Sequence, residues 1–191
     1  MRKLIFIFFF LICSSAQATT FINVPANVQR SLSRYTVPLP PQINFEYGSC
    51  PTTPFLSSCT TYTPGTKVFD HIYLVPYQFA LDDLHHEVGH LFDMAYMNAR
   101  SRALFFAMDH RTPTKWYIRH TDVPVVSESE RFADIYRFCS YQDNNVMVSH
   151  YKSQDDFNVN ISHAALPRFR AFMRAVAAGV YGPPDYQSFS S

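Results

Sequence analysis

The sequence predicts an α+β fold, because two strand-like segments precede three helix-like segments in a chain of 191 residues. Residues 43–47 alternate apolar and polar side chains, and residues 68–75 are rich in β-branched and aromatic residues, as strands are. Three later segments carry apolar side chains at helical spacing: residues 79–98, 127–141 and 164–178. We therefore expect a small sheet followed by a mostly helical C-terminal part.

The segments between these elements are less regular. Residues 23–33 could form a short helix, which the Pro-rich residues 38–41 prevent from continuing. The Thr-, Pro- and Ser-rich residues 50–66 predict a loop or a hairpin connection. Residues 101–126 are undecided, since 103–108 could continue a helix while the rest is typical of a loop.

The chain begins like an exported precursor. Arg2 and Lys3 precede an apolar run at residues 4–12, and a small-residue Ala-Gln-Ala pattern ends at Ala18. We expect residues 1–18 to be a cleaved signal peptide, because the apolar run is too short to span a membrane. The mature protein is then secreted or periplasmic, with no stable membrane insertion.

The rest of the chain is expected to form one domain, residues 19–182, followed by a flexible tail, residues 183–191. Without the two cations of the leader, 14 basic side chains face 15 acidic ones, and no long basic run is present. Nucleic acid is therefore not an expected partner. Eighteen Phe and twelve Tyr indicate a chain with a buried core, and we expect a monomer.

The cysteines fit an oxidising compartment. Cys50 and Cys59 could close a small loop by a disulfide, and Cys139 is then left as a buried apolar residue. Cys13 belongs to the segment expected to be removed, with a lipid anchor as the alternative. The remaining cysteines are too widely spaced to form a Cys-rich zinc site together.

The segment His86-Glu87-Val88-Gly89-His90 matches the H-E-x-x-H pattern of zinc enzymes. Two histidines four residues apart lie on one face of a helix, so that both imidazoles can bind one ion. Glu87 points about 100° away from His86, which suits a general base that accepts a proton from the water that zinc activates. A catalytic zinc needs a third protein ligand.

Glu130 is the predicted third ligand, because it lies opposite the apolar stripe of its own helix. Asp134 is one turn further on the same side, and two carboxylates at this spacing repel unless something positive lies near them. A zinc ion beside Glu130, with Asp134 holding an imidazole N–H, would supply that charge. The alternative is that Ser127 and Glu130 form a capping box and that Arg137 pairs with Asp134 on a solvated face.

Other histidines and acids are weaker candidates for the site. Asp93 follows His90 on the same helix face and is expected to support the ligands or make a surface contact, with direct ligation as the alternative. His85 points between the apolar stripe of its helix and the face that carries His86 and His90, and it is not expected to bind metal. The remaining histidines are isolated and are expected to have ordinary polar or packing roles: His71, His110, His120, His150 and His163.

The two motifs together resemble the gluzincin zinc metallopeptidases, and among them the group of the anthrax lethal factor catalytic domain. The resemblance covers residues 86–93, His-Glu-Val-Gly-His-Leu-Phe-Asp, and residues 130–137, Glu-Arg-Phe-Ala-Asp-Ile-Tyr-Arg. It implies a zincin-like fold, in which a twisted mixed sheet lies over an active-site helix and a helical lower part carries the ligand glutamate. It also implies that residues 68–75 form the sheet edge along which a substrate peptide lies.

The same resemblance implies the roles of the site residues. His86, His90 and Glu130 would bind zinc, Glu87 would be the general base, and Asp134 would orient a ligand histidine. The resembling enzymes carry a tyrosine shortly before the ligand glutamate, where this chain has Val123, which has no side-chain donor. Two residues that precede Glu130 could stabilise the oxyanion instead: Tyr117 and His120. Tyr151, after Glu130, is a further alternative.

These residues predict an exported zinc metallopeptidase that hydrolyses peptide bonds in a protein or peptide substrate. One alternative is a secreted binding or toxin-like module that keeps zinc for structure and has no turnover. Another is hydrolysis of a cell-wall cross-link peptide.

Overall fold

The computed structural model describes residues 18–51, 54, 58–62, 68–76, 80–110, 116, 128–140 and 163–185. Among them it forms an α+β fold with one mixed four-stranded sheet and five α-helices. The expected signal peptide lies outside these residues except for Ala18, and so do Tyr117 and His120.

The strands are β1 (Thr20–Ile22), β2 (Gln42–Tyr47), β3 (Ser58–Tyr62) and β4 (Phe69–Leu74). Their order in the sheet is β1-β2-β4-β3. The β1–β2 and β2–β4 pairs are parallel, whereas β3 runs antiparallel to β4. The α-helices are α1 (Ala26–Leu32), α2 (Ala80–Tyr96), α3 (Ala99–Met108), α4 (Glu128–Ser140) and α6 (Leu166–Ala177), and a 3₁₀ turn, His163–Ala165, precedes α6.

The expected position of the substrate-binding edge was wrong. Residues 68–75 do contain a strand, but β4 pairs with β2 on one side and with β3 on the other. The edge strand beside β4 is β3, which lies within residues 50–66, where the sequence predicts only a loop or hairpin connection. The error has a physical cause, since strand order depends on pairings between distant segments, which the local pattern of one strand does not encode.

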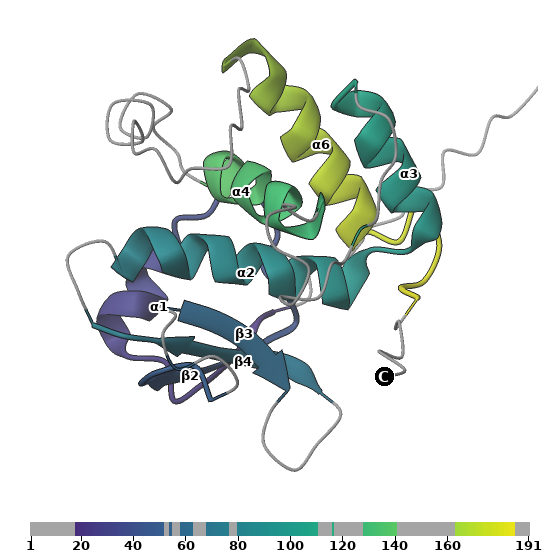
Figure 1. Ribbon diagram of the computed structural model, residues 1–191. Coiled ribbons are helices and arrows are strands. Elements are labelled where there is room, and N and C mark those ends of the chain that lie inside the picture. The colour runs from purple at the N-terminus through teal and green to yellow at the C-terminus, as the bar shows by residue number, and fades with distance from the viewer. Residues whose placement is uncertain are drawn as a thin grey trace, which may run out of the picture.

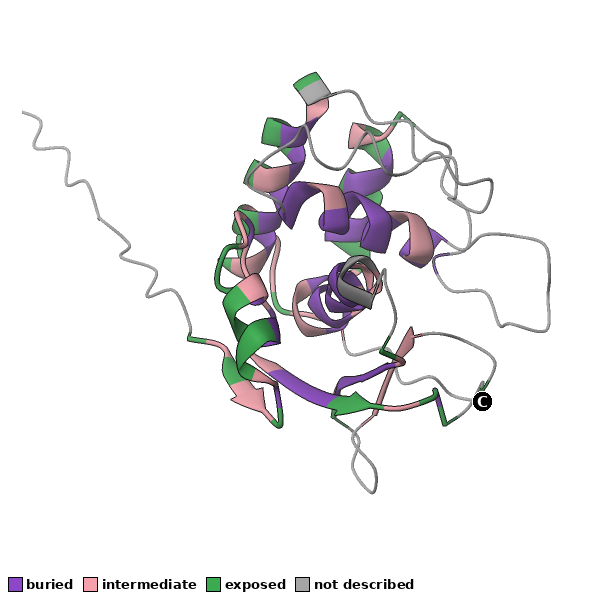
Figure 2. Ribbon diagram, turned by 90° about the vertical axis from the view of Figure 1, so that its left-hand side faces the viewer, coloured by how far each residue is buried: buried purple, intermediate pink, exposed green. Residues whose placement is uncertain are grey.

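Helix α2 lies between the sheet and the helices α3, α4 and α6, whereas α1 lies beside the sheet (Figure 1). Ile72 and Leu74 of β4 and Leu84 and Val88 of α2 are fully buried in one core. On its other side α2 packs closely against α4. The view along α2 in Figure 2 shows buried residues on both sides of this helix. Both faces of α2 are therefore covered by other elements, and a helix in this position can bring polar residues to its contact with α4.

A disulfide joins Cys50 to Cys59, with the two Cα atoms 5.7 Å apart. It is the pair that the spacing of the cysteines favours. Cys50 follows the end of β2 and Cys59 lies in β3, so the bond fastens the edge strand to the segment after β2. Cys139 is a buried free cysteine in α4.

The residues at the start of α3 form hydrogen bonds with residues 183–185, the beginning of the segment expected to be a flexible tail. The side chain of Asn98 caps α3 by accepting from the backbone N–H of Ser101, at 3.0 Å. Its amide nitrogen also donates to the carbonyl oxygen of Pro183, at 2.8 Å. Asp185 accepts from the backbone N–H of Ala99, at 2.6 Å. Residues 183–185 are thus attached to the helical part, and residues 186–191 lie outside the described chain.

None of the helices among the described residues has the length and apolar character needed to cross a membrane.

Candidate metal centre

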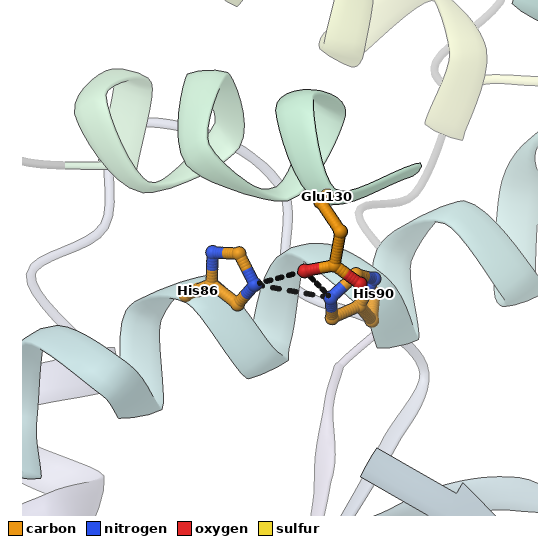
Figure 3. Close-up of side chains that lie close together, drawn as sticks. All are labelled: His86, His90 and Glu130. Carbon is orange, nitrogen blue, oxygen red and sulfur yellow. Dashed lines mark hydrogen bonds and ion pairs between the residues drawn. The ribbon is translucent and has the colours of Figure 1, made fainter. Parts of the chain in front are cut away.

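His86 and His90 lie one turn apart on the face of α2 that meets α4 (Figure 3). Their rings are nearly perpendicular, with centroids 4.8 Å apart, and the two Nε2 atoms are 3.1 Å from each other. The spacing of four residues accounts for this arrangement, because it places both side chains on the same side of a helix. Both imidazoles therefore present a nitrogen to one point.

Glu130 in the first turn of α4 completes the cluster (Figure 3). Its Oε2 atom is 3.0 Å from Nε2 of His86 and 3.3 Å from Nε2 of His90. The side chain retains 31% of its exposure, whereas the two histidine side chains retain 13% and 14%. The three side chains form a group that could hold a metal ion, with the glutamate on its more open side.

Gly89 allows the two helices to approach closely at this point. A Cβ atom at position 89 would lie 2.7 Å from the Cα atom and 3.0 Å from the carbonyl oxygen of Ala133. These contacts are with backbone, which cannot rotate away as a side chain can. The glycine between the two histidines therefore has a packing reason, since it brings the backbone of α4 close enough for Glu130 to reach the imidazoles.

Asp134 holds His86 from the side away from the cluster. Its Oδ1 atom is 2.9 Å from Nδ1 of His86 and 3.1 Å from a guanidinium nitrogen of Arg137. Asp134 and Arg137 are both buried, so their pair does not lie on a solvated face. A carboxylate beside Nδ1 favours the tautomer with its proton there, which leaves the Nε2 lone pair facing the cluster. The capping alternative involves Ser127, which lies outside the described residues.

The electrostatics of the cluster favour a positive charge at its centre. Burial lowers the pKa of His86, but hydrogen bonds and charges from Asp134 and Glu130 raise it to about 10. Burial also lowers the pKa of His90, yet Glu130 raises it above its usual value. Burial raises the pKa of Glu130, but the two imidazoles bring it well below the usual value. A proton on His86 supplies the positive charge, and a metal cation could replace it.

Glu87 faces the sheet rather than α4. It is buried, and its Oε1 atom accepts a hydrogen bond from the hydroxyl of Ser58, at 2.8 Å. Burial raises the pKa of Glu87, while His90, His86 and the Ser58 hydroxyl partly offset this rise. Because Ser58 is the first residue of β3, the carboxylate lies between the two histidines and the edge strand. A carboxylate with a raised pKa in this position suits proton transfer near neutral pH.

His85 has a structural environment of its own. Its Nδ1 atom is 3.0 Å from the hydroxyl of Ser140, its Nε2 atom is 3.3 Å from the hydroxyl of Ser31, and its ring contacts Tyr35. Burial, with a smaller contribution from the charge of Arg137, lowers the pKa of His85 to about 3. A neutral His85 therefore links α1, α2 and α4, and it is not part of the metal cluster.

Asp93 binds two residues that sequence reasoning did not single out. Its Oδ1 atom accepts from Nε of Arg102, at 3.0 Å, and its Oδ2 atom accepts from Nε1 of Trp116, at 2.7 Å. Asp93 is 1% exposed, so the expected surface contact is replaced by a buried ion pair. Neither Arg102 nor Trp116 belongs to a recognisable motif, and neither does Ser58, so no local pattern indicates these three residues.

The structure thus brings together His86, Glu87, His90, Glu130 and Asp134, and it places Asp93 at a second contact further along α2. The two proposed oxyanion donors lie outside the described residues. The chain matches no protein family model, no curated protein and no solved structure. The fold and the site define an α+β protein with a two-histidine, one-glutamate group able to hold a metal ion.

Proposed function

We propose that this protein is an exported zinc metallopeptidase of the gluzincin type. The observation that carries the proposal is the convergence of His86 Nε2, His90 Nε2 and Glu130 Oε2 from two helices. Because His86 and His90 belong to one H-E-x-x-H segment, the same helix also supplies a buried carboxylate, Glu87. A neutral imidazole pair with one carboxylate is a ligand set used by catalytic zinc.

The spacing of the three ligand atoms fits zinc. Zinc binds imidazole nitrogen and carboxylate oxygen at about 2.0–2.2 Å, so that two ligands of a tetrahedral site lie roughly 3.3 Å apart. The three pairs of atoms are separated by 3.0, 3.1 and 3.3 Å. Three protein ligands leave one of the four tetrahedral positions for water or substrate, as in catalytic sites and unlike closed structural ones.

The proposed chemistry assigns each neighbouring residue a task. When bound, zinc supplies a Lewis acid that polarises a carbonyl and acidifies water. Glu87 accepts the proton of the attacking water and delivers it to the leaving amine. Ser58 holds the Glu87 carboxylate by its hydrogen bond, and Asp134 fixes the imidazole of His86.

A zincin-like fold is part of the proposal. Three features support it: a mixed sheet on one side of the histidine helix, an antiparallel strand at one sheet edge, and a helical part that supplies Glu130. We propose that a substrate peptide binds beside β3 by strand addition, because β3 ends the strand order and its residue Ser58 contacts Glu87.

We also propose export to a secreted or periplasmic location. The apolar segment after Arg2 and Lys3 supports this assignment, as does the Cys50–Cys59 disulfide, because disulfides persist in oxidising compartments.

Metal analysis of the mature protein, with a general protease assay, tests the proposal. We expect one zinc per chain and hydrolysis that a chelator abolishes. Glu87→Gln should keep zinc and lose hydrolysis, because an amide cannot accept the proton. Glu130→Ala should lose both. The matched control is Glu46→Gln, since the Glu46 side chain is 57% exposed in the sheet.

The outcomes separate the candidate functions. Zinc in the wild type without hydrolysis of any peptide would favour the binding module without turnover. Hydrolysis of purified sacculi but of no protein or linear peptide would favour the cell-wall substrate. Wild-type affinity for zinc in the Glu130→Ala protein would remove that residue from the ligand set, and the absence of zinc from the wild type would end the metallopeptidase proposal.

A further inference from the structure

Trp116 is the only tryptophan of the chain, and it bonds to both helices that carry the metal cluster. It is 8% exposed. Its indole Nε1 donates to Oδ2 of Asp93 in α2, at 2.7 Å. Its backbone carbonyl accepts from the N–H of Ser129 in α4, at 2.9 Å. One residue thus bonds to both helices.

The two contacts are adjacent in sequence to the proposed ligands. Asp93 follows His90 by three residues, and Ser129 directly precedes Glu130. The bond to Ser129 uses a backbone N–H of the first helical turn, which has no partner within the helix. Trp116 therefore connects the first turn of α4 to the turn of α2 that follows the second histidine.

The ring of Trp116 is itself closely held. The guanidinium of Arg102 lies 5.5 Å from the ring, and Phe105 and Phe106 contact it edge to face, at 5.7 and 5.6 Å. Arg102 also pairs with Asp93 and with Asp185. The indole N–H has a fixed acceptor, and the ring has little freedom to turn away from it.

The contacts between α2 and α4 are spread along both helices. Gly89 meets Ala133, and towards the C-terminal end of α4 His86 bonds to Asp134 and His85 to Ser140. The first turn of α4 lies at the opposite end of this row of contacts. Glu130 lies at this end of α4, one turn before Ala133. The Trp116 bonds act at this end.

We propose that Trp116 is a positioning residue, which holds the first turn of α4 against α2 so that the Glu130 carboxylate stands ready beside both imidazoles. This inference rests on the proposed metal site. Partners hydrogen-bonded directly to a metal ligand change metal affinity by about 10–100-fold when they are replaced. Trp116 bonds instead to Asp93 and to Ser129, the chain neighbour of Glu130, so it acts on the ligands through these residues.

The test compares the affinities of Trp116→Phe and wild-type protein for Zn²⁺, measured by competition with a chelator. Phenylalanine keeps an aromatic ring and removes the indole N–H. We expect an affinity about tenfold weaker, at the lower end of the range for direct partners of a ligand. The visible absorption of bound Co²⁺ should also shift toward that of Glu130→Ala, because the carboxylate is no longer held in place.

Two further variants make the result specific. Ser129→Pro removes the N–H that Trp116 accepts from while leaving the ring intact, and proline is tolerated in the first turn of a helix. It should weaken Zn²⁺ binding in the same direction. Tyr96→Phe is the matched control. It removes the hydroxyl by which Tyr96 of α2 donates to the carbonyl oxygen of Leu39, at 3.1 Å, and this bond does not involve α4. It should keep wild-type affinity even if its melting temperature falls.

Wild-type Zn²⁺ affinity and an unchanged Co²⁺ spectrum in either folded variant, Trp116→Phe or Ser129→Pro, would overturn the positioning role while leaving the metal site intact. Equal weakening in Tyr96→Phe would reduce the effect to general destabilisation and overturn it as well. A wild-type protein that binds neither Zn²⁺ nor Co²⁺ would overturn the metallopeptidase proposal itself, and this inference with it.

Discussion

Helix α2 carries two polar clusters, one turn apart, which balance their charges differently. At the first, His86 and His90 meet Glu130, and a proton on His86 balances the Glu130 carboxylate. At the second, Asp93 pairs with Arg102, whose guanidinium carries a permanent positive charge. Both lie between α2 and the neighbouring helices. Arg137 pairs with Asp134 beside the first cluster, but the ion pairs of Glu130 are with imidazoles, whereas Asp93 meets its permanent cation directly.

This difference separates a site that can exchange its cation from one that cannot. A proton can leave and be replaced by a metal ion, since the metal requires neutral imidazoles. A buried arginine stays charged at all accessible pH values and keeps its carboxylate partner satisfied. The first cluster is therefore suited to binding, and the second to holding the fold.

Arg102→Leu should be the most destabilising change. It leaves the Asp93 carboxylate buried without its cation, which costs about 3–5 kcal/mol of unfolding free energy. Urea unfolding of the metal-free protein measures this loss. Arg30→Leu replaces an exposed arginine of α1 and should stay within roughly 0.5 kcal/mol of wild type. Equal losses in the two variants would show that the second cluster does not depend on its internal charge balance.

Gly89→Ala should affect both the fold and the first cluster. The new Cβ atom would meet the backbone of Ala133 at 2.7 Å, which forces α2 and α4 apart. We expect a loss of about 1–3 kcal/mol in stability together with weaker zinc binding. Gly48→Ala is the control, because a Cβ there meets no atom within 4 Å. Wild-type zinc affinity in Gly89→Ala would show that the cluster tolerates a change in helix separation.

Zinc binding should release between one and two protons. With a pKa of about 10, metal-free His86 is protonated at pH 7.5, and the pKa of His90 is also raised. Affinity should therefore fall as the pH falls, by about tenfold per pH unit for each proton released. Calorimetric titration in buffers of different ionisation enthalpy counts the protons. His71→Gln, in the sheet, should leave the count unchanged, and a count of zero in wild type would show that no proton occupies the first cluster.

Ser58→Ala should have the smallest effect. The Ser58 hydroxyl lowers the pKa of Glu87, so its removal raises that pKa further. Protonated Glu87 cannot act as a base, and the acidic limb of the kcat/KM profile should move to higher pH. We expect about 1 kcal/mol, or roughly fivefold, on the acidic side, with unchanged zinc content. Thr61→Ala, on the other face of β3, is the control; the same shift in that variant would remove the specific role of Ser58.

The sequence predicted those parts of the site that depend on spacing within one helix. The positions of His86 and His90 follow from their separation by four residues, and Glu130 and Asp134 share a face of α4 for the same reason. The meeting of the two helices was a hypothesis from the carboxylate pair of Glu130 and Asp134 and from motif resemblance, because no local pattern encodes the close contact at Gly89. The α+β class is confirmed, since strand and helix periodicities are local properties.

The sequence did not predict the strand order or the second cluster. The sequence of β3 is Ser-Cys-Thr-Thr-Tyr, and the residues around it are rich in proline and threonine. This composition is typical of a loop, so the strand was not predicted. Its place at the sheet edge depends on pairing with β4. Arg102 and Trp116 lie in residues 101–126, for which the sequence predicts no definite structure. Their common partner is Asp93 of α2, and this pairing depends on how α2, α3 and Trp116 pack together.

The attachment of Asp185 sets a practical lower limit on how far the protein can be shortened. This carboxylate contacts both Arg102 and the backbone at the beginning of α3, at 2.7 and 2.6 Å. A recombinant fragment that stops at residue 182 would discard this contact and leave the guanidinium with one acidic neighbour fewer. Affinity tags for purification are therefore better appended after residue 191 than substituted for the last nine residues.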